Sequence, residues 1–466
     1  MRKPNSIVLA MLSALVLGGC ASFSEDGGFG AIESATRSQL QKDVVWARDD
    51  SSRERVQKRV NALLEKPLSA DDAVQIALLN NPGLQAALNT LGLAEADRVA
   101  ASRLPNPGFS VGRLTRGSEI EWERSLHFNL ARLLTMPMRA DIEQRLFEQT
   151  RRKLTLEVLR LASDTRKAWV AAVAAAETAQ VQREAMEAAE AGAELARRMA
   201  EVGNWSKLKY AREQSFYADT ALAVARAEQA KIQAQERLAR LLGVADPARM
   251  KLPSRLPDLP ASLPPLANVE QQAMDSRLDL QMVKLESEAL AKNLDLTRRT
   301  RFINVLELGA SLNSSNEEPV QRGYEISFEL PLFDWGQSRV LAAESRYRQI
   351  LERARETAIN ARSEVREAHA MLQSRYAVAR HVRDEVLPLK KRISEENVLR
   401  YNGMLIGVFE LLADARSQLA AVNTAIETSR DFWLAEADLQ MALVGTPGKT
   451  MVTNTAAAPS DAGGGH

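Results

Sequence analysis

The sequence predicts a mainly α-helical protein with a small β part, in which long antiparallel coiled-coil helices adjoin four strands per chain. Three observations support this fold class: one very long helical run, two pairs of alternating strands, and a second copy of the whole pattern about 200 residues further on. A chain of 466 residues would ordinarily divide into several globular domains. A chain of this length can instead form a few long helices that pack along one another.

The longest helix is predicted from Pro137 to Val202, a run with a single glycine and no further proline. At a rise of about 1.5 Å per residue, roughly 65 residues span roughly 100 Å. From Leu154 to Ala200, small and apolar residues recur at alternating spacings of four and three, the pattern of coiled-coil packing. Gly203-Asn204 then interrupts the pattern and a second helix returns to Leu242. A long helical hairpin is therefore predicted.

Two strands are predicted before this hairpin, at 109–115 and 121–130, with a turn at Gly117-Ser118 between them. A matching pair is predicted at 304–313 and 322–331. The second strand of each pair alternates between an apolar and a polar face, as a barrel strand does. The polar positions that we expect to line a barrel lumen include Glu121, Glu123, His127, Glu325 and Glu329.

The only cysteine, Cys20, marks the N-terminal region. A basic start and a short apolar run lead to Leu17-Gly18-Gly19-Cys20, which matches the bacterial lipoprotein signal. We therefore expect a covalent lipid on Cys20. An ordinary secretory signal with a chance cysteine is the alternative. Ala21 stands where an aspartate would favour the inner membrane, so delivery to the outer membrane is expected. One cysteine also excludes an internal disulfide framework.

The second half of the chain repeats the first. Four pairs of landmarks are 200 residues apart: Phe128 and Phe328, Leu130 and Leu330, Arg139 and Arg339, and Gly203 and Gly403. The predicted organisation is a signal peptide at 1–19, a lipid-anchored segment at 20–66, a first repeat at 67–246, a proline-rich linker at 247–266, a second repeat at 267–445 and a disordered tail at 446–466.

The strand count predicts an oligomer. Four strands cannot close a barrel, and an open sheet edge is not tolerated in lipid. Two chains would supply eight strands, whose interior side chains fill, whereas three would supply twelve, which can leave a bore.

Charge and motifs exclude several function classes. The formal net charge is +1, which gives no reason to expect nucleic acid as a partner. The four histidines show no metal-ligand spacing, and neither a catalytic set nor a phosphate-binding loop is present. We expect no enzyme activity and no cofactor apart from the lipid on Cys20, so any energy must come from a partner.

Several short motifs, in this order and within the duplicated frame, resemble the TolC-type outer-membrane factor family. They are Leu68-Ser69 with Asp72-Ala73, Ala77 and Asn81-Pro82; Pro331-Leu332-Phe333-Asp334; and Tyr401-Asn402-Gly403 followed by Leu411-Leu412 and Ala415. The resemblance covers about 68–445. It implies a homotrimer with a twelve-stranded outer-membrane β-barrel continuous with a periplasmic α-barrel. It also implies docking with a periplasmic adaptor protein and an inner-membrane pump.

The resemblance also assigns residues. It implies that Glu410 and Asp414, four apart on one helix face, form acidic rings at a periplasmic aperture; an ordinary solvated helix face is the alternative. The helical tips, Gly203-Asn204 and Gly403-Met404, would contact the adaptor, although the apolar Met404-Leu405-Ile406 departs from more polar tips in the family. Glycine at 203 and 403 is expected to permit the reversal of the chain.

The function expected is a passive exit duct across periplasm and outer membrane for small toxic solutes, such as drugs or metal ions. A proton-driven pump is favoured over an ATP-driven one. The alternatives are the exit duct of a type I protein secretion system and a lipid-anchored coiled-coil scaffold without a pore.

Overall fold

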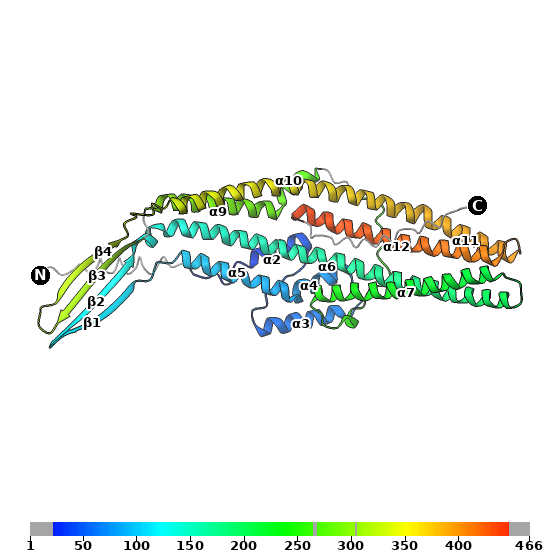
Figure 1. Ribbon diagram of the computed structural model, residues 1–466, viewed down its shortest axis with the longest axis horizontal. Coiled ribbons are helices and arrows are strands. Elements are labelled where there is room, and N and C mark those ends of the chain that lie inside the picture. Colours follow the sequence, from blue (N-terminus) through cyan, green and yellow to red (C-terminus); the bar gives the residue numbers. More distant parts are fainter. Residues whose placement is uncertain (1–21, 264–267, 303–304, 447–466) are drawn as a thin grey trace.

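The structure is a computed structural model that describes residues 22–263, 268–302 and 305–446. Cys20 and the signal region 1–19 lie outside the described residues. The molecule is elongated (Figure 1). A four-stranded sheet lies at one end, and the tips of two helical hairpins lie at the other. The shorter helices within 30–80, here called the belt, lie at the middle.

The two halves of the chain contain the same order of elements. The first has α4 (Ala70–Asn80), α5 (Pro82–Ala101), β1 (Gly108–Arg116), β2 (Glu119–Asn129), α6 (Leu130–Glu201) and α7 (Lys207–Leu242). The second has α8 (Val269–Ser276), α9 (Leu278–Thr300), β3 (Leu306–Ser315), β4 (Gln321–Phe328), α10 (Gln337–His381), η2 (Val382–Val386), α11 (Leu387–Asn402) and α12 (Val408–Val444). The fold class, a mainly helical chain with one small antiparallel sheet, is confirmed.

Helix α6, with 72 residues, packs on α4, α5, α7, α9 and α12 and so contacts both halves of the chain. It begins at Leu130, seven residues before the predicted start at Pro137. The Asn129 side chain accepts a hydrogen bond from Arg132 N at 2.7 Å and so caps the helix. Small side chains on the predicted seam, such as Ala172 and Ala196, are buried, which lets the neighbouring helices approach closely.

The corresponding helix of the second half is interrupted. A turn of π-helix, η2, joins α10 to α11, and Pro388 follows at the second position of α11. Proline has no N–H to donate and its ring crowds the carbonyl four residues earlier, which the wider π-helical turn accommodates. No residue of α11, all of which the structure describes, is buried.

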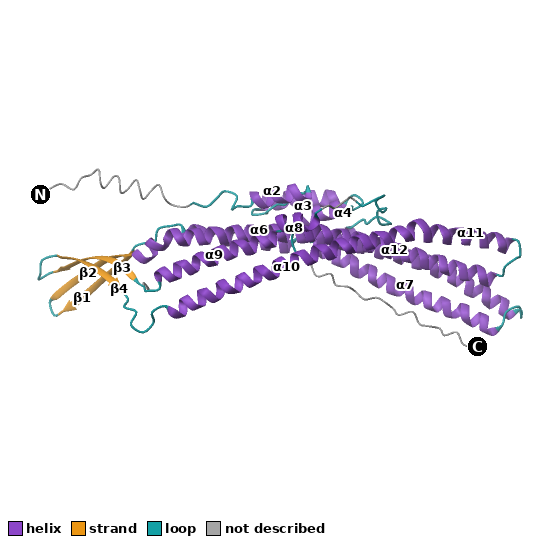
Figure 2. Cartoon of the chain, turned by 90° about the horizontal axis from the view of Figure 1, so that it is seen from above, coloured by secondary structure: helices purple, strands orange, loops and turns teal. Residues whose placement is uncertain are grey.

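The belt lies at mid-length, where the largest core cluster is found. There α4 and the end of α7 pack on α6 through Ile76, Trp169, Ala172 and Leu242, all of them buried. Figure 2 shows α2, α3 and α4 gathered on one side of the long helices. Helices α2 (Gly30–Leu40) and α3 (Asp50–Leu64), within the segment 20–66, were not predicted from the sequence.

In each half, the residues at the junction of the first two helices of the repeat donate hydrogen bonds to the end of the last helix. This contact is here called the joint. In the first half, Asn80 Nδ2 donates to Leu242 O and Asn81 Nδ2 donates to Leu241 O, both at 2.9 Å. These bonds satisfy the last carbonyls of α7, which have no partner within the helix.

The second half makes this joint with other residues. Ser276 Oγ donates to Leu443 O and the guanidinium of Arg277 donates to Ala442 O, both at 3.0 Å. Arg277, 1% exposed, also forms ion pairs with Asp279 at 2.6 Å and Glu364 at 2.7 Å. A buried charged network thus replaces two neutral amides.

In the part of the chain that the structure describes, none of the helices combines the length and apolar composition needed to cross a membrane.

Candidate functional site

The sheet runs in the order β1-β2-β3-β4, and every neighbouring pair is antiparallel. Its register divides the side chains between two faces. One face, here called the polar face, carries Gly108, Ser110, Gly112, Leu114, Glu121, Glu123, Ser125, His127, Glu307, Gly309, Ser311, Asn313, Gly323, Glu325 and Ser327. The other, here called the apolar face, carries Phe109, Val111, Arg113, Trp122, Arg124, Leu126, Phe128, Leu306, Leu308, Ala310, Leu312, Arg322, Tyr324, Ile326 and Phe328.

Side-chain size differs between the faces as strongly as polarity does. All four glycines of the strands lie on the polar face. The space above them is taken by neighbouring side chains: a Cβ on Gly323 would meet Ser311 Oγ at 2.7 Å, and one on Gly309 would meet His127 Nδ1 at 3.1 Å. Small residues on a crowded face and aromatic residues on the opposite face suit a sheet that curls around its polar side.

Hydrogen bonds connect residues across the polar face. Ser125 Oγ lies 2.8 Å from His127 Nε2 and 2.5 Å from Ser110 Oγ. Glu121, Glu123 and His127 thus share one face of β2, and Glu325 lies on the same face of β4. Glu329 lies one residue beyond the end of β4.

The two outer strands leave the sheet open. The backbone of β1 is paired only with β2, and that of β4 only with β3, within the described residues. Both strands are exposed along almost their whole length. Long edges of this kind can pair with a further strand, and neither β1 nor β4 carries a proline or bulge that would block one.

The two helical tips lie side by side at the far end of the molecule. The Trp205 ring of the first tip meets the Phe409 ring of the second edge-on, with ring centroids 6.4 Å apart. In the first tip Gly203 has a φ of +79°, as expected. The expectation that Gly403 would play this part is wrong, because Met404 holds the left-handed conformation instead, with a φ of +59°. Backbone bonds from Met404 N to Tyr401 O at 3.0 Å and from Leu405 N to Arg400 O at 2.8 Å enforce that turn.

Glu410 and Asp414 lie in the first two turns of α12, directly after the second tip. Glu410 is exposed, whereas Asp414 is half-buried and its Oδ2 finds no hydrogen-bond partner among the described residues. Two residues on, Arg416 forms an ion pair with Glu213 of α7 and stacks over Phe216 at 3.9 Å. Glu213 is 1% exposed, so this pair fastens the second hairpin to the first. This ion pair was not predicted from the sequence, since no spacing rule connects residues of different hairpins.

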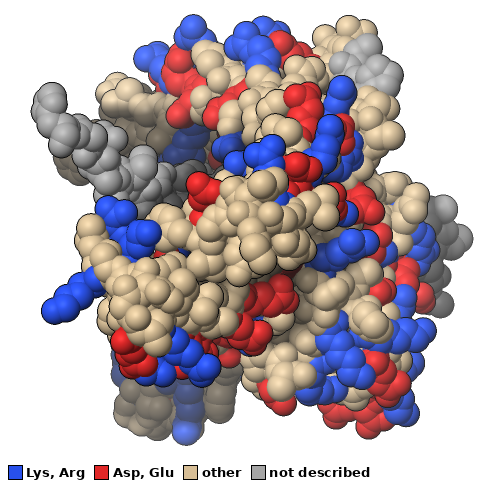
Figure 3. All heavy atoms as spheres, turned by 90° about the vertical axis from the view of Figure 1, so that its right-hand side faces the viewer, with Lys and Arg blue, Asp and Glu red and all other residues tan. Residues whose placement is uncertain are grey.

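Charge at the tip end is evenly mixed. Figure 3 views the molecule from that end and shows basic and acidic side chains interspersed. Many are paired, as in Arg197 with Glu201 at 2.6 Å and Arg400 with Glu396 at 3.2 Å. Hydrogen bonds from Arg197 and Arg198 lower the pKa of Glu194 to about 2. The tip end therefore presents paired charges around exposed apolar residues such as Met404.

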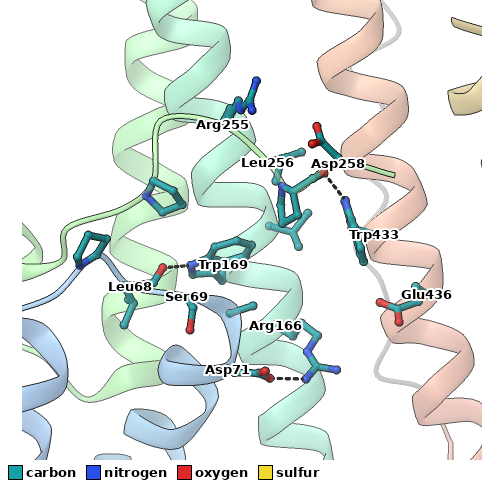
Figure 4. A pocket seen from close by; sticks show the side chains of 15 residues that line it. Leu68, Ser69, Asp71, Arg166, Trp169, Arg255, Leu256, Asp258, Trp433 and Glu436 are labelled. Atoms are coloured by element: carbon teal, nitrogen blue, oxygen red, sulfur yellow. Dashed lines mark hydrogen bonds and ion pairs between the residues drawn. The ribbon is translucent and has the colours of Figure 1, made fainter. Parts of the chain in front are cut away.

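A pocket of about 690 Å³ lies between α4, α6, α12 and the linker segment at 253–258 (Figure 4). Its two indoles are engaged: Trp169 Nε1 donates to Leu68 O at 2.8 Å and Trp433 Nε1 donates to Pro257 O at 3.2 Å. Arg166 is paired with Asp71 at 3.0 Å. The Trp433 bond holds the linker against α12, and the other two hold the segment 68–71 against α6. We therefore interpret the pocket as a structural contact between these segments. Burial raises the pKa of Glu436 at its rim.

No family model matches the sequence, and no curated protein matches it. Solved structures do. The outer-membrane channel MtrE of Neisseria gonorrhoeae, in its open state, shares 18% identity over 83% of this chain and 89% of its own, with a TM-score of 0.65. The outer-membrane channel CmeC of Campylobacter jejuni shares 17% identity over 84% and 85%, with a TM-score of 0.65. The outer-membrane protein VceC of Vibrio cholerae shares 15% identity over 84% and 98%, with a TM-score of 0.64. The chain therefore has the fold of these outer-membrane channel proteins, as its resemblance to the TolC-type outer-membrane factors predicted.

Proposed function

We propose that this chain is one protomer of a trimeric outer-membrane duct, in which twelve strands form a barrel continuous with a periplasmic tube of helices. The observation that carries the proposal is the sheet: four strands with two open edges, a crowded polar face and an exposed apolar face. Three copies close the edges, place the polar face around water and turn the apolar face to lipid.

The duct is passive and works with partners. We propose that it exports small toxic solutes, with a periplasmic adaptor at the helical tips and an inner-membrane pump supplying energy. The tips support this role because their exposed apolar residues, Met404 at 92% and Leu405 at 78%, lie among paired charges. A proton-driven pump is favoured. A type I secretion duct would use the same architecture and remains the second candidate, to be separated by identifying the pump that copurifies. The lipid on Cys20 would add an anchor in the outer membrane.

Trimer formation tests the proposal most simply. Native mass spectrometry of the protein in detergent should show three chains, each with a lipid-modified Cys20. A stable monomer that conducts ions would contradict the topology, and an unmodified N-terminus would remove the anchor but leave the duct.

The aperture requires a separate test. Three copies of Glu410 and Asp414 around a narrow opening would repel one another unless a cation bound them. Divalent cations on the periplasmic side should therefore reduce conductance, and Glu410→Ala with Asp414→Ala should weaken that block. Glu427→Ala, an exposed carboxylate further along α12, is the matched control. Equal block in all three proteins would remove Glu410 and Asp414 from the gate.

A further inference from the structure

Three arginines interrupt the apolar face of the sheet. Arg124 and Arg322 lie in one row across the strands, separated by Leu312, because Arg124 pairs with Leu312 and Leu312 with Arg322. Arg113 pairs with Trp122 in the next row toward the turns, and its guanidinium lies 5.8 Å from the Trp122 ring centroid. All three therefore lie toward the turn end of the same face.

The rows on the helix side of these arginines are apolar. The nearest row is Phe109, Leu126, Ala310 and Tyr324, and the next contains Phe128, Leu308 and Ile326. Beyond the strands the exposed apolar surface continues through Leu332 and Phe333, which are 68% and 100% exposed. The seven residues from Arg322 to Phe328 span roughly 20 Å along the strand. The arginines thus form the outer border of an apolar band.

These cations have no acidic neighbours on their own face. In the four strands, all of which the structure describes, every glutamate of the paired rows points to the polar face. None of the three arginines forms an ion pair with a described carboxylate. A guanidinium beside hydrocarbon is costly without a counter-charge, so the counter-charge should come from outside the chain.

We propose that Arg113, Arg124 and Arg322 form a binding surface for the phosphate groups of anionic lipid in the leaflet at the turn end of the barrel. The inference rests on the proposed function, which turns this face to lipid. The long side chains lie along the apolar rows and place their guanidinium groups at headgroup level, where each can bind a phosphate through two parallel hydrogen bonds. Trp122 lies at the same level, where aromatic side chains anchor membrane barrels. Three copies of the chain give nine such arginines, a belt of positive charge around the outer rim.

The test measures lipid retention by the intact protein. The protein in a neutral detergent is titrated with phosphatidic acid, and separately with phosphatidylcholine of the same acyl chains, and bound lipid is counted by native mass spectrometry. We expect selective retention of phosphatidic acid, with about a fivefold loss for each arginine replaced. The triple variant R113Q/R124Q/R322Q should lose the selectivity, whereas the triple lysine variant should keep part of it because lysine keeps the charge but not the bidentate geometry.

The matched control is Arg116→Gln, at the end of β1 on the polar face, which should retain phosphatidic acid as the parent does. Inorganic phosphate in excess should not displace the lipid, since the acyl chains and the apolar rows contribute to binding; displacement would assign the site to free phosphate. Equal retention of the two lipids by the parent, or full retention by the glutamine variant, would overturn the inference. The same spectra report the number of chains, so a trimer without lipid selectivity overturns only this inference, whereas a monomer overturns the proposed function.

Discussion

The joints of the two repeats both satisfy the backbone carbonyls at the end of a helix, but they use different side chains to do so. At each joint, two consecutive side chains donate to the last carbonyls of the returning helix: Asn80 and Asn81 in the first repeat, Ser276 and Arg277 in the second. Helix-end carbonyls require donors wherever they are buried, but any donor of the right reach suffices. The requirement is therefore duplicated while the residues are free to differ.

The difference has an energetic consequence. A neutral amide that is lost leaves one or two unpaired carbonyls, whereas a buried arginine that is lost leaves unpaired carboxylates as well. The second joint should therefore be more sensitive to substitution and to pH than the first, although both donate two hydrogen bonds to the end of the returning helix.

Replacing the charged member should have the largest effect. Arg277→Ala should destabilise the second joint by about 3–5 kcal/mol, because Asp279 stays buried without its cation. Asn81→Ala should destabilise the first by about 1–2 kcal/mol, through loss of a helix cap and one carbonyl partner. Hydrogen exchange of the amides at 278–284 and 84–90 measures the two joints separately. Equal loss of protection at both would contradict the comparison.

Acid should weaken the second joint and not the first, because the donors of the first are neutral amides. Burial disfavours the charged form of Asp279, but hydrogen bonds from Arg277 outweigh it and hold the pKa of that carboxyl below its usual range. A depressed pKa contributes stability that is present above the ordinary pKa of an aspartate and is lost as pH falls through the folded value. The stability difference between the parent and Asp279→Asn should accordingly shrink between about pH 5 and pH 2 in thermal unfolding. A difference that is independent of pH would show that Asp279 is not ionised in the fold.

The glycines that end the two returning helices also differ. Gly243 has a φ of +66°, and a Cβ there would meet Asn80 O at 2.5 Å, a backbone atom that cannot move away freely. Gly445 is extended, and a Cβ there would meet only the tip of Leu156. Gly243→Ala should therefore destabilise the protein by about 1–2 kcal/mol from its backbone conformation alone, and Gly445→Ala by less. Thermal unfolding of the two variants measures this, and the reverse order would contradict it.

The smallest effect is expected at the tips. Met404 occupies the left-handed conformation that Gly203 occupies in the first tip. Met404→Gly should relieve that strain and stabilise the second tip by up to about 1 kcal/mol, whereas Gly203→Met should destabilise the first. Hydrogen exchange at 399–406 provides the measurement. A loss of protection in Met404→Gly would mean that the methionine side chain stabilises the tip.

The elements with strong periodicity were predictable. The four strands were placed to within about three residues at each end, and both hairpins turn where the glycines indicated. Helix α3 was missed because its 15 residues bury only Ser52, Val60 and Leu64, too few to give an amphipathic pattern. The early start of α6 had a signal in Asn129, a good N-cap, which Pro137 obscured.

The candidate site was predictable only where alternation decides it. The two faces of β2 follow from its sequence, and the register then fixes the faces of the other strands. Contacts between the hairpins were not predictable, because Glu213 and Arg416 meet only after both hairpins have packed. The left-handed residue of the second tip was also missed, since it depends on backbone hydrogen bonds and not on residue preference.

A single measurement decides whether the polar face surrounds a pore. Glu123→Cys and Leu126→Cys lie three residues apart on β2 and point to opposite faces of the sheet. In planar bilayers, a charged, membrane-impermeant thiol reagent should reduce the conductance of Glu123→Cys and leave Leu126→Cys and the parent, with Cys20 alone, unchanged. Block of Leu126→Cys with no effect on Glu123→Cys would place the apolar face inward and contradict the proposed duct, as would a protein that forms no channels at all.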